Sequence, residues 1–260
     1  MASKYPIILA HGIVVKDFKY FKAFGKIEKV LKDAGYVVYT SCTDGFGAIE
    51  SNAHQLKVQI QDILAKHNVD KVNIIAHSKG GLDSRYMIER LDMEDKVASL
   101  TTICSPHKGS HLATRLYSLP RWILNFVAFW INFWYKLCGD KRPDSLEVLR
   151  QLKEIPPEKY EDAVKCKSVY SQSYSAIMKK SSDDFVMGMP LRIIQKIETD
   201  DHSDGLVSVE SCKWADYKGN CIDDPVSHSQ LIDFMVGKEK REKIHGFYLS
   251  ICEDLTKRGF

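Results

Sequence analysis

One serine stands between small residues at the junction of a predicted strand and a predicted helix. Residues 72–81 read VNIIAHSKGG, so Ser78 is flanked two residues away by Ala76 and Gly80. A serine on a tight strand-to-helix turn is held in strained backbone geometry with its hydroxyl exposed, and small neighbours let the turn pack against adjoining strands. The order of strand, turn and helix therefore predicts a nucleophilic Ser78 rather than an accidental polar turn.

Backbone amides near this serine could stabilise negative charge that develops on a substrate oxygen. Lys79 would be the first residue of the helix, where free N–H groups and the helix dipole favour an anion. A second donor should come from the loop after the first predicted strand, where Gly12 lets the backbone approach a ligand. We therefore expect an oxyanion hole formed by the N–H groups of Ile13 and Lys79. A simple turn that ends the strand is the alternative.

A catalytic serine also needs an acid, which precedes the histidine in hydrolases with this type of nucleophile turn. Asp200, Asp201 and Asp204 all follow a predicted strand at residues 191–197. Asp204 is preferred because Gly205 allows a tight turn that would point the carboxylate inward. A solvated acidic loop is the alternative for all three aspartates.

Nine histidines compete for the role of base. Only His228 follows the acid in a loop ahead of the last predicted helix, as the chain order requires. Ser78, Asp204 and His228 would then form a triad in which the histidine removes the serine proton during attack on a carbonyl. A surface histidine without a catalytic role is the alternative.

The first half of the chain alternates apolar strand patterns with helical patterns. This alternation is typical of a parallel sheet covered by helices, and nearly continuous apolar strands indicate burial on both faces. Gly35 should end the first helix. Strands are predicted at residues 5–10, 36–41, 71–76 and 98–104, and helices at 18–34, 49–67 and 79–91.

The alternation stops after residue 106. Residues 112–177 predict helices only, so an inserted helical cap or lid over the sheet is expected at about 112–178. A strand is predicted again at residues 190–194, and a final helix near 239–255. We predict one α/β domain over residues 1–260, with a mostly parallel central sheet flanked by helices.

Five segments, in this order along most of the chain, resemble the bacterial triacylglycerol lipases. They look like the oxyanion loop, the nucleophile turn, the next strand with its Pro-His turn, the acid loop and the base of that family. The segments are PIILAHGI (6–13), AHSKGG (76–81), TTICSPHKGS (101–110), SDGLVS (203–208) and VSH (226–228).

The resemblance implies an α/β-hydrolase fold and the cleavage of carboxylic esters through an acyl-enzyme on Ser78. The expected substrate is a lipid or a small ester, and no cofactor is required. A phospholipase or an acyltransferase on the same triad remains open, because fold and nucleophile do not fix the acceptor or the head group. The intact triad argues against a binding module without catalysis.

Two positions depart from the family pattern. Ala76 stands where glycine is commonest, which is a mild steric change. Many relatives carry an aspartate two residues after the catalytic histidine that ligates a structural calcium ion, and here that position is Gln230. Because calcium needs six to eight oxygen ligands, the missing carboxylate makes calcium doubtful. If a metal ion binds, Asp183 or Asp184 is the expected ligand.

Residues 119–137 form an apolar segment that is rich in aromatic side chains. It is too short to span a bilayer as a helix. Apolar side chains fall around nearly its whole circumference, so the helix should be covered on most sides. A buried cap helix is one interpretation. We favour a mobile lid that covers Ser78 in water and contacts lipid at an interface, because Arg121 and Lys136 bracket the segment.

Composition argues against several other classes of protein. Hydrophobic residues make up 44% of the chain, which suffices for a sizeable core, and its 37 basic and 34 acidic residues are interspersed, so no nucleic-acid partner is expected. The seven cysteines form no CxxC pair, so free thiols are expected, with Cys212 and Cys221 as the one plausible bridge. The apolar run at residues 7–10 is too short for a signal peptide or a membrane span, which predicts a cytoplasmic chain, or a secreted one if it has been trimmed.

Overall fold

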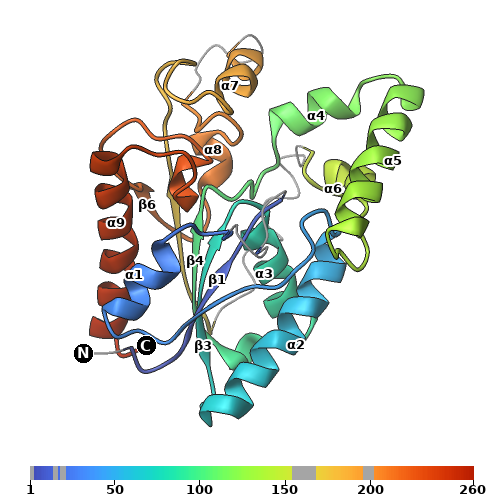
Figure 1. The fold of residues 1–260 in the computed structure, drawn as a ribbon. Helices are drawn as coiled ribbons and strands as arrows, with labels where there is room; N and C mark the ends of the chain where they lie inside the picture. The colour runs from blue at the N-terminus through green and yellow to red at the C-terminus, as the bar shows by residue number, and fades with distance from the viewer. Residues whose placement is uncertain (1–2, 14–16, 18–21, 154–167, 196–201) are drawn as a thin grey trace.

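A parallel sheet forms the centre of the molecule. The computed structural model describes residues 3–13, 17, 22–153, 168–195 and 202–260 (Figure 1). Within them, six strands lie in the order β2-β1-β3-β4-β5-β6, and each neighbouring pair runs parallel. The strands are β1 (Ile7–Ala10), β2 (Val38–Thr40), β3 (Val72–His77), β4 (Val97–Ile103), β5 (Tyr170–Ser175) and β6 (Asp216–Asn220).

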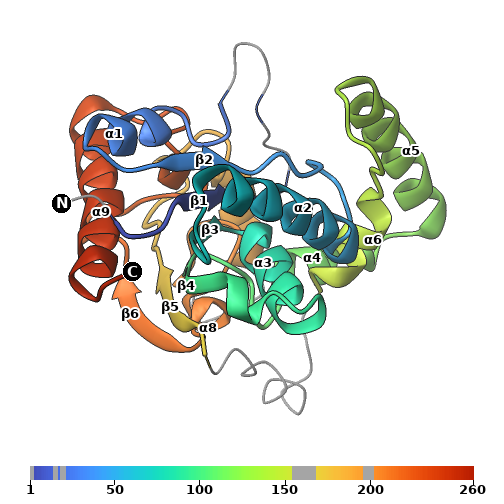
Figure 2. The same ribbon diagram turned by 90° about the horizontal axis from the view of Figure 1, so that it is seen from below.

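Helices cover both faces of this sheet (Figure 2). Successive side chains of a strand point to opposite faces. Accordingly, Ile7 and Leu9 of β1 join the core on the side of α1 and α9, whereas Ile8 and Ala10 join the core on the side of α2 and α3. The helices are α1 (Ile27–Asp33), α9 (Lys238–Lys257), α2 (Ile49–His67) and α3 (Lys79–Arg90).

The strands predicted for the first half of the chain and the helices at 49–67 and 79–91 are confirmed, with small shifts at their ends, whereas the first helix is shorter than predicted. The first helix begins only at Ile27, and residues 18–21 of the predicted helix lie outside the described residues. Gly35 follows this helix with a φ of 91°, in the left-handed region that favours glycine. The final predicted helix is also present, as α9.

The prediction of helices only over residues 112–177 is wrong at its end, because β5 lies in this stretch and pairs with β4. Its sequence, YSQSYS, is polar, and its buried polar side chains are satisfied by neighbours. Gln172 donates a hydrogen bond of 2.9 Å to the Thr101 hydroxyl, and Ser173 donates one of 2.5 Å to the Trp214 carbonyl. The chain therefore returns to the sheet at Tyr170, before the predicted end of the insertion at residue 178.

The strand predicted at residues 190–194 is also wrong, because α7 (Gly188–Ile194) is a helix. A short apolar run does not distinguish a strand from a buried helix by periodicity. Leu191 and Ile194, three residues apart, are both buried and so share one helix face. Pro190 lies in the first helical turn, where its missing N–H costs little.

Three helices form the insertion between β4 and residue 153, and Figure 1 shows them beside the sheet at the same end of the molecule as α7, which contacts α4. The longest, α5, stands away from the sheet and packs against α6. The expectation that α5 is covered on most sides is wrong, because only Leu124 and Ala128 of this helix are buried. The helices are α4 (His111–Tyr117), α5 (Arg121–Leu137) and α6 (Ser145–Gln151).

The C-terminal end of α5 is fastened to the loop before α2. The buried carboxylate of Asp44 accepts hydrogen bonds of 2.8 Å from the N–H groups of both Lys141 and Arg142. In return, the N–H of Phe46 donates a 3.0 Å hydrogen bond to Asp140. These contacts anchor one end of the aromatic helix to the main body of the molecule.

Candidate active site

Ser78 occupies a strained turn between β3 and α3. Its φ of 56° and ψ of −133° are unusual for a residue with a side chain, and its N–H donates a 2.9 Å hydrogen bond to the Ile103 carbonyl of the next strand. Strain of this kind persists only where the surroundings enforce it and is concentrated at functional sites. The local sequence therefore folds into the strand-to-helix turn that a serine nucleophile requires.

Two glycines let the oxyanion loop lie directly against this turn. A Cβ atom at Gly80 would lie 2.4 Å from the Ala10 carbonyl oxygen and 2.6 Å from that of His11. A Cβ atom at Gly12 would lie 2.6 Å from the Cβ of Ser78. No real side chain fits at such separations, so glycine at both positions is needed to bring β1 and its loop next to the nucleophile.

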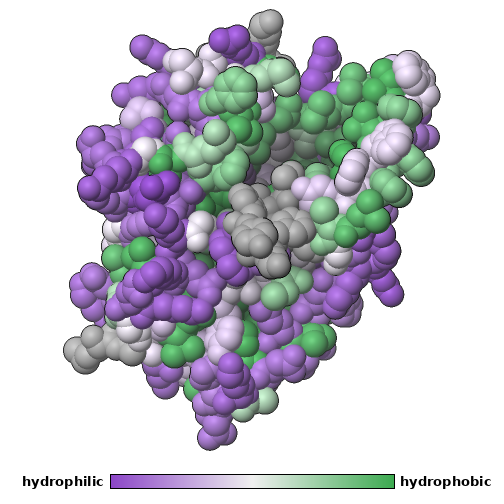
Figure 3. Space-filling model, viewed as in Figure 1, coloured by the Kyte–Doolittle hydropathy of each residue, from purple (hydrophilic) through white to green (hydrophobic). Residues whose placement is uncertain are grey.

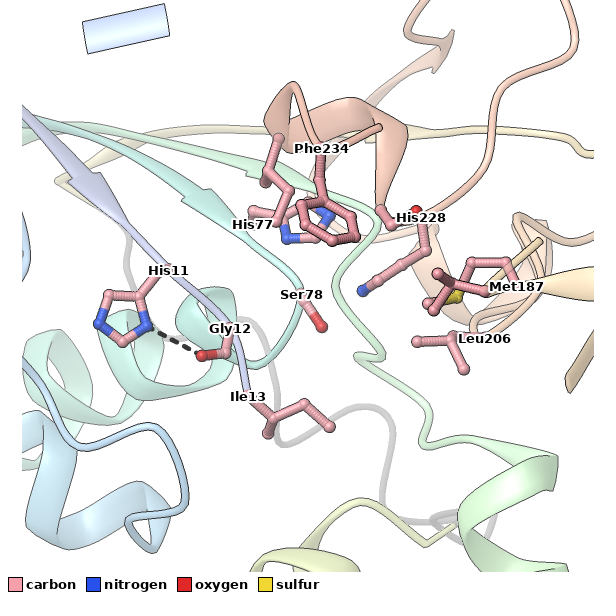
Figure 4. Close-up of a pocket in the computed structure, with 12 residues that line it drawn as sticks. His11, Gly12, Ile13, His77, Ser78, Met187, Leu206, His228 and Phe234 are labelled. Carbon is pink, nitrogen blue, oxygen red and sulfur yellow. Dashed lines mark hydrogen bonds between the residues drawn. The ribbon is translucent and has the colours of Figure 1, made fainter. Parts of the chain in front are cut away.

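His228 and Asp204 form a buried pair beside Ser78. The Nδ1 of His228 lies 2.6 Å from Oδ2 of Asp204, and the His228 N–H donates to the Asp204 carbonyl over 2.9 Å. The other carboxylate oxygen of Asp204 accepts hydrogen bonds of 2.9 and 2.8 Å from the N–H groups of Leu206 and Val207. These bonds fix the acid, and in Figure 4 the free edge of the His228 ring points toward the Ser78 hydroxyl.

The structure thus brings together the three residues predicted as the triad. The alternative acids Asp200 and Asp201 lie outside the described residues. His77 also lies near the base, with its ring centroid 4.4 Å from that of His228. Burial, reinforced by the nearby His228, holds the pKa of His77 well below its usual value, so this ring is neutral.

One of the predicted oxyanion donors, Ile13, lines the same cavity, and the other, Lys79, directly follows Ser78. Gly12 and Ile13 line the cavity that contains the Ser78 hydroxyl (Figure 4), and Lys79 is the first residue of α3. The first N–H groups of a helix have no partner within the helix and remain available to an anion. The arrangement can therefore stabilise a negatively charged oxygen next to Ser78.

The cavity over Ser78 is almost entirely apolar and has a volume of about 310 Å³. This size is at the lower end of the range for ligand pockets. Its few polar groups come from Ser78 and His228, from the loop after β1, and from His77 and Ser229, as expected where a few polar groups orient an apolar ligand. The lining residues are His11, Gly12, Ile13, His77, Ser78, Val186, Met187, Leu206, His228, Ser229, Ile232 and Phe234.

Comparison with known proteins agrees with this geometry. A family model described as palmitoyl protein thioesterase matches residues 6–180, which contain the oxyanion loop and the nucleophile. The chain belongs to this family. Because its members and the relatives described next are named as ester or thioester hydrolases, the predicted enzyme class, a carboxylic ester hydrolase, is confirmed.

Relatives of this thioesterase-family chain include several lipases. It is 29% identical to triacylglycerol lipase 2 of Saccharomyces cerevisiae, over 90% of this chain and 73% of that protein. It is 36% identical to a triacylglycerol lipase of Pseudarthrobacter phenanthrenivorans, over 43% of this chain and 36% of that protein. The match therefore spans only about a third of the bacterial relative. The predicted resemblance to lipases is confirmed.

Solved structures confirm the fold. The lipase of Staphylococcus hyicus superposes with a TM-score of 0.68 at 15% sequence identity, over 98% of this chain and 96% of that structure. At such low identity the match supports the α/β-hydrolase architecture and not a particular substrate.

A buried ion pair involves the side chain of Lys79, whose N–H is one of the predicted oxyanion donors of this thioesterase-family chain. The Nζ of Lys79 lies 2.6 Å from Oδ1 of Asp83 one helical turn later, and both side chains are almost completely buried. Asn52 donates a 3.2 Å hydrogen bond to the other oxygen of Asp83. Burial raises the pKa of Asp83 to about 6, although Lys79 acts in the opposite direction.

Replacing Asp83 with asparagine should strongly destabilise the fold. The change leaves the buried Lys79 ammonium without a counter-charge, and breaking a buried pair in this way costs about 3–5 kcal/mol. Urea unfolding would measure the loss. The double variant Lys79→Met/Asp83→Leu is the matched control and should be close to the wild type, because it removes both charges. An Asp83→Asn variant as stable as the wild type would contradict this account of the pair.

The four apolar residues Val186, Met187, Ile232 and Phe234 of the cavity wall were not predicted as site residues. They come from segments that lie far from Ser78 in the sequence and approach it only in the fold. The sequence does contain a signal for these wall residues, because apolar residues directly follow both Asp184 and the loop that carries His228.

The remaining predicted site residues have structural partners. Asp183 and Asp184 precede α7, and Asp184 is buried against the loop that carries His228.

Cys212 and Cys221 are free thiols, as is each cysteine in the described part of the chain. Cys166 lies outside the described residues.

Proposed function

We propose that this chain hydrolyses esters of long-chain fatty acids, with triacylglycerol as the leading substrate class, through an acyl-enzyme on Ser78. The observation that carries the proposal is the buried Asp204–His228 pair at the strained Ser78 turn, in a cavity lined almost wholly by apolar groups. The names of the yeast and bacterial lipase relatives support the same substrate class.

The proposed reaction begins with attack of the Ser78 hydroxyl on the ester carbonyl while His228 takes up its proton. Asp204 holds the imidazole in the required tautomer and stabilises its charged form. The N–H groups of Ile13 and Lys79 stabilise the oxyanion. His228 then gives the proton to the departing alcohol, and a water molecule activated by the same histidine releases the fatty acid. This sequence requires no cofactor.

The surface around the cavity fits a lipid substrate. Figure 3 shows hydrophobic residues on both rims of a hollow between the α7 side and the α5 side. On α5, Trp122 is 73% exposed and Phe126 is 64% exposed, and Phe185, which precedes α7 in the chain, is 96% exposed. A group of large apolar side chains that are exposed to water to this extent is typical of an interaction surface. Within the described residues, no helix combines the length and apolarity that a membrane crossing needs.

We propose that α5 acts as a lid that contacts lipid with its aromatic face. Its exposed aromatic side chains, and the charges of Arg121 and Lys136 near its two ends, suit a helix that lies in the plane of a lipid surface. The buried residues Leu124 and Ala128 would remain against the rest of the insertion, while the aromatic side chains enter the lipid.

A panel of substrates tests the proposed function. We expect p-nitrophenyl palmitate and emulsified trioleoylglycerol to be hydrolysed with higher kcat/KM than p-nitrophenyl acetate, because a longer acyl chain buries more apolar surface in the cavity. A preference for acetate, or no hydrolysis of any ester, would contradict the proposal.

A thioesterase is the second candidate function, favoured by the family model that matches residues 6–180. The triad and the apolar cavity would serve a palmitoyl thioester equally well, because the acyl group is the same. Palmitoyl-CoA and dipalmitoyl phosphatidylcholine added to the panel distinguish a thioesterase and a phospholipase from a triacylglycerol lipase.

The variant Trp122→Asp should impair action on lipid droplets selectively. A charge on the most exposed aromatic residue of α5 opposes insertion into an apolar phase, so the rise in rate as trioleoylglycerol passes its solubility limit should shrink. Hydrolysis of dissolved p-nitrophenyl acetate should be unchanged. Val58→Asp is the matched control, since Val58 is 58% exposed on α2. An equal effect of the two variants, or a wild-type rate without any rise at the solubility limit, would show that α5 is not a lid.

A further inference from the structure

The catalytic base candidate is flanked by two buried serines that share one partner. The hydroxyl groups of Ser227 and Ser229 donate hydrogen bonds of 2.5 and 2.6 Å to the same oxygen, Oδ2, of Asp184. Since His228 lies between these serines, the carboxylate holds the backbone on both sides of the base. Hydrogen bonds to a charged acceptor are about twice as strong as neutral ones.

The other oxygen of Asp184 holds the opposite wall of the cavity. Oδ1 accepts hydrogen bonds of 2.6 and 3.0 Å from the N–H groups of Val186 and Met187. Both residues line the space over Ser78. Together, the four hydrogen bonds outweigh the effect of burial and hold the pKa of Asp184 below its usual value, so the group is a charged acceptor.

The resemblance to lipases raised calcium as the alternative role for these residues, but the site does not fit it. Calcium needs six to eight oxygen ligands, whereas both oxygens of Asp184 are already hydrogen-bonded. The carbonyl of Asp183 accepts from Gln230 over 3.2 Å, and its Oδ2 accepts from the Lys180 N–H over 2.8 Å. The Nζ of Lys240 lies 3.4 Å from the Gln230 side-chain oxygen, which places a positive charge where a cation would have to bind.

The described residues also contain no cluster of three or more histidine, cysteine or acidic side chains that could bind a metal. We propose that Asp184, with no bound metal ion, is a positioning residue for His228, which it holds through Ser227 and Ser229. The proposal rests on the proposed function, in which His228 is the base. It assigns to this enzyme a metal-independent means of fixing the base loop.

The decisive variant is Ser227→Ala/Ser229→Ala, which removes both donors without adding or removing a charge. We expect kcat to fall by about 10²-fold, the size of effect that a small misplacement of a catalytic group produces. KM for p-nitrophenyl butyrate should change little, because the apolar side chains that line the cavity are retained and Ser229→Ala removes only a hydroxyl group from its wall. The low-field proton resonance of the bond between His228 Nδ1 and Asp204 should broaden or shift. Asp184→Asn should show the same fall in kcat and the same change of the low-field resonance.

Ser99→Ala is the matched control, because Ser99 is a fully buried, hydrogen-bonded serine in the part of β4 remote from Ser78. The proposal is overturned if the double serine variant loses no more kcat than Ser99→Ala and keeps the low-field resonance. It is also overturned if EDTA inactivates the wild type and calcium restores its activity and raises its Tm. The resonance and the Tm need no substrate, so a wild type that hydrolyses no ester would contradict the proposed function and still leave the role of Asp184 open to test.

Discussion

Ser78→Ala is expected to lower kcat for ester hydrolysis by about 10⁶-fold, the scale of loss seen when a triad nucleophile is removed. The residual rate would come from substrate binding and the oxyanion donors alone. Alanine tolerates the turn as well as serine does, because the adjoining glycines and not the hydroxyl allow its close packing. Steady-state kinetics, with thermal unfolding to verify the fold, would measure the effect.

Labelling by a fluorophosphonate provides an independent control for this prediction. The wild type should be labelled in the peptide that contains Ser78, and the alanine variant should not be labelled. Turnover retained by Ser78→Ala would refute the acyl-enzyme mechanism as a whole.

Asp204→Asn should lower kcat by about 10⁴-fold while leaving the structure intact. The amide can still accept hydrogen bonds from Leu206 and Val207, but it presents an N–H group to His228 in place of the carboxylate oxygen 2.6 Å away. The imidazole is then held in the wrong tautomer, and its charged form loses its stabilising partner. The kcat, measured together with the Tm, tests this effect.

A nearly normal rate in Asp204→Asn would move the role of the acid to another carboxylate. Asp200 and Asp201 are the first alternatives, although they lie outside the described residues. His228→Ala provides the comparison, because it should reduce kcat to the level of Ser78→Ala if the two residues act as a unit.

The nucleophile turn could be predicted from sequence because its geometry makes strict local demands. Ser78 needs φ and ψ values that only a tight turn supplies, and Gly80 is needed where a Cβ atom would collide with the β1 backbone. These steric requirements restrict which residue types can occur at fixed positions around the serine, so the turn can be recognised in the sequence. The acid and the base were found differently, through chain order and through their place in loops.

Two elements could not be predicted because their state is decided by distant partners. Strand β5 is polar, and its burial is favourable because its buried side chains form hydrogen bonds with distant partners, such as those of Gln172 to Thr101 and of Ser173 to the Trp214 carbonyl. In contrast, the apolar run in α7 has a composition that fits a strand equally well, and tertiary packing selects the helix. The cavity wall was missed for the same reason, since Met187 precedes α7.

Because Asp44 anchors only the C-terminal end of α5, a rotation of this helix would move its N-terminal end the most. Its anchored end lies at residues 140–142, and Trp122 is about 21 Å along the axis from Lys136, at a rise of 1.5 Å per residue. Any rotation about the anchored end therefore displaces Trp122 far more than the residues next to Asp44. In such a rotation Trp122 would move through the widest arc, whereas the anchored end adjoins Asn52, which also contacts Asp83 on α3.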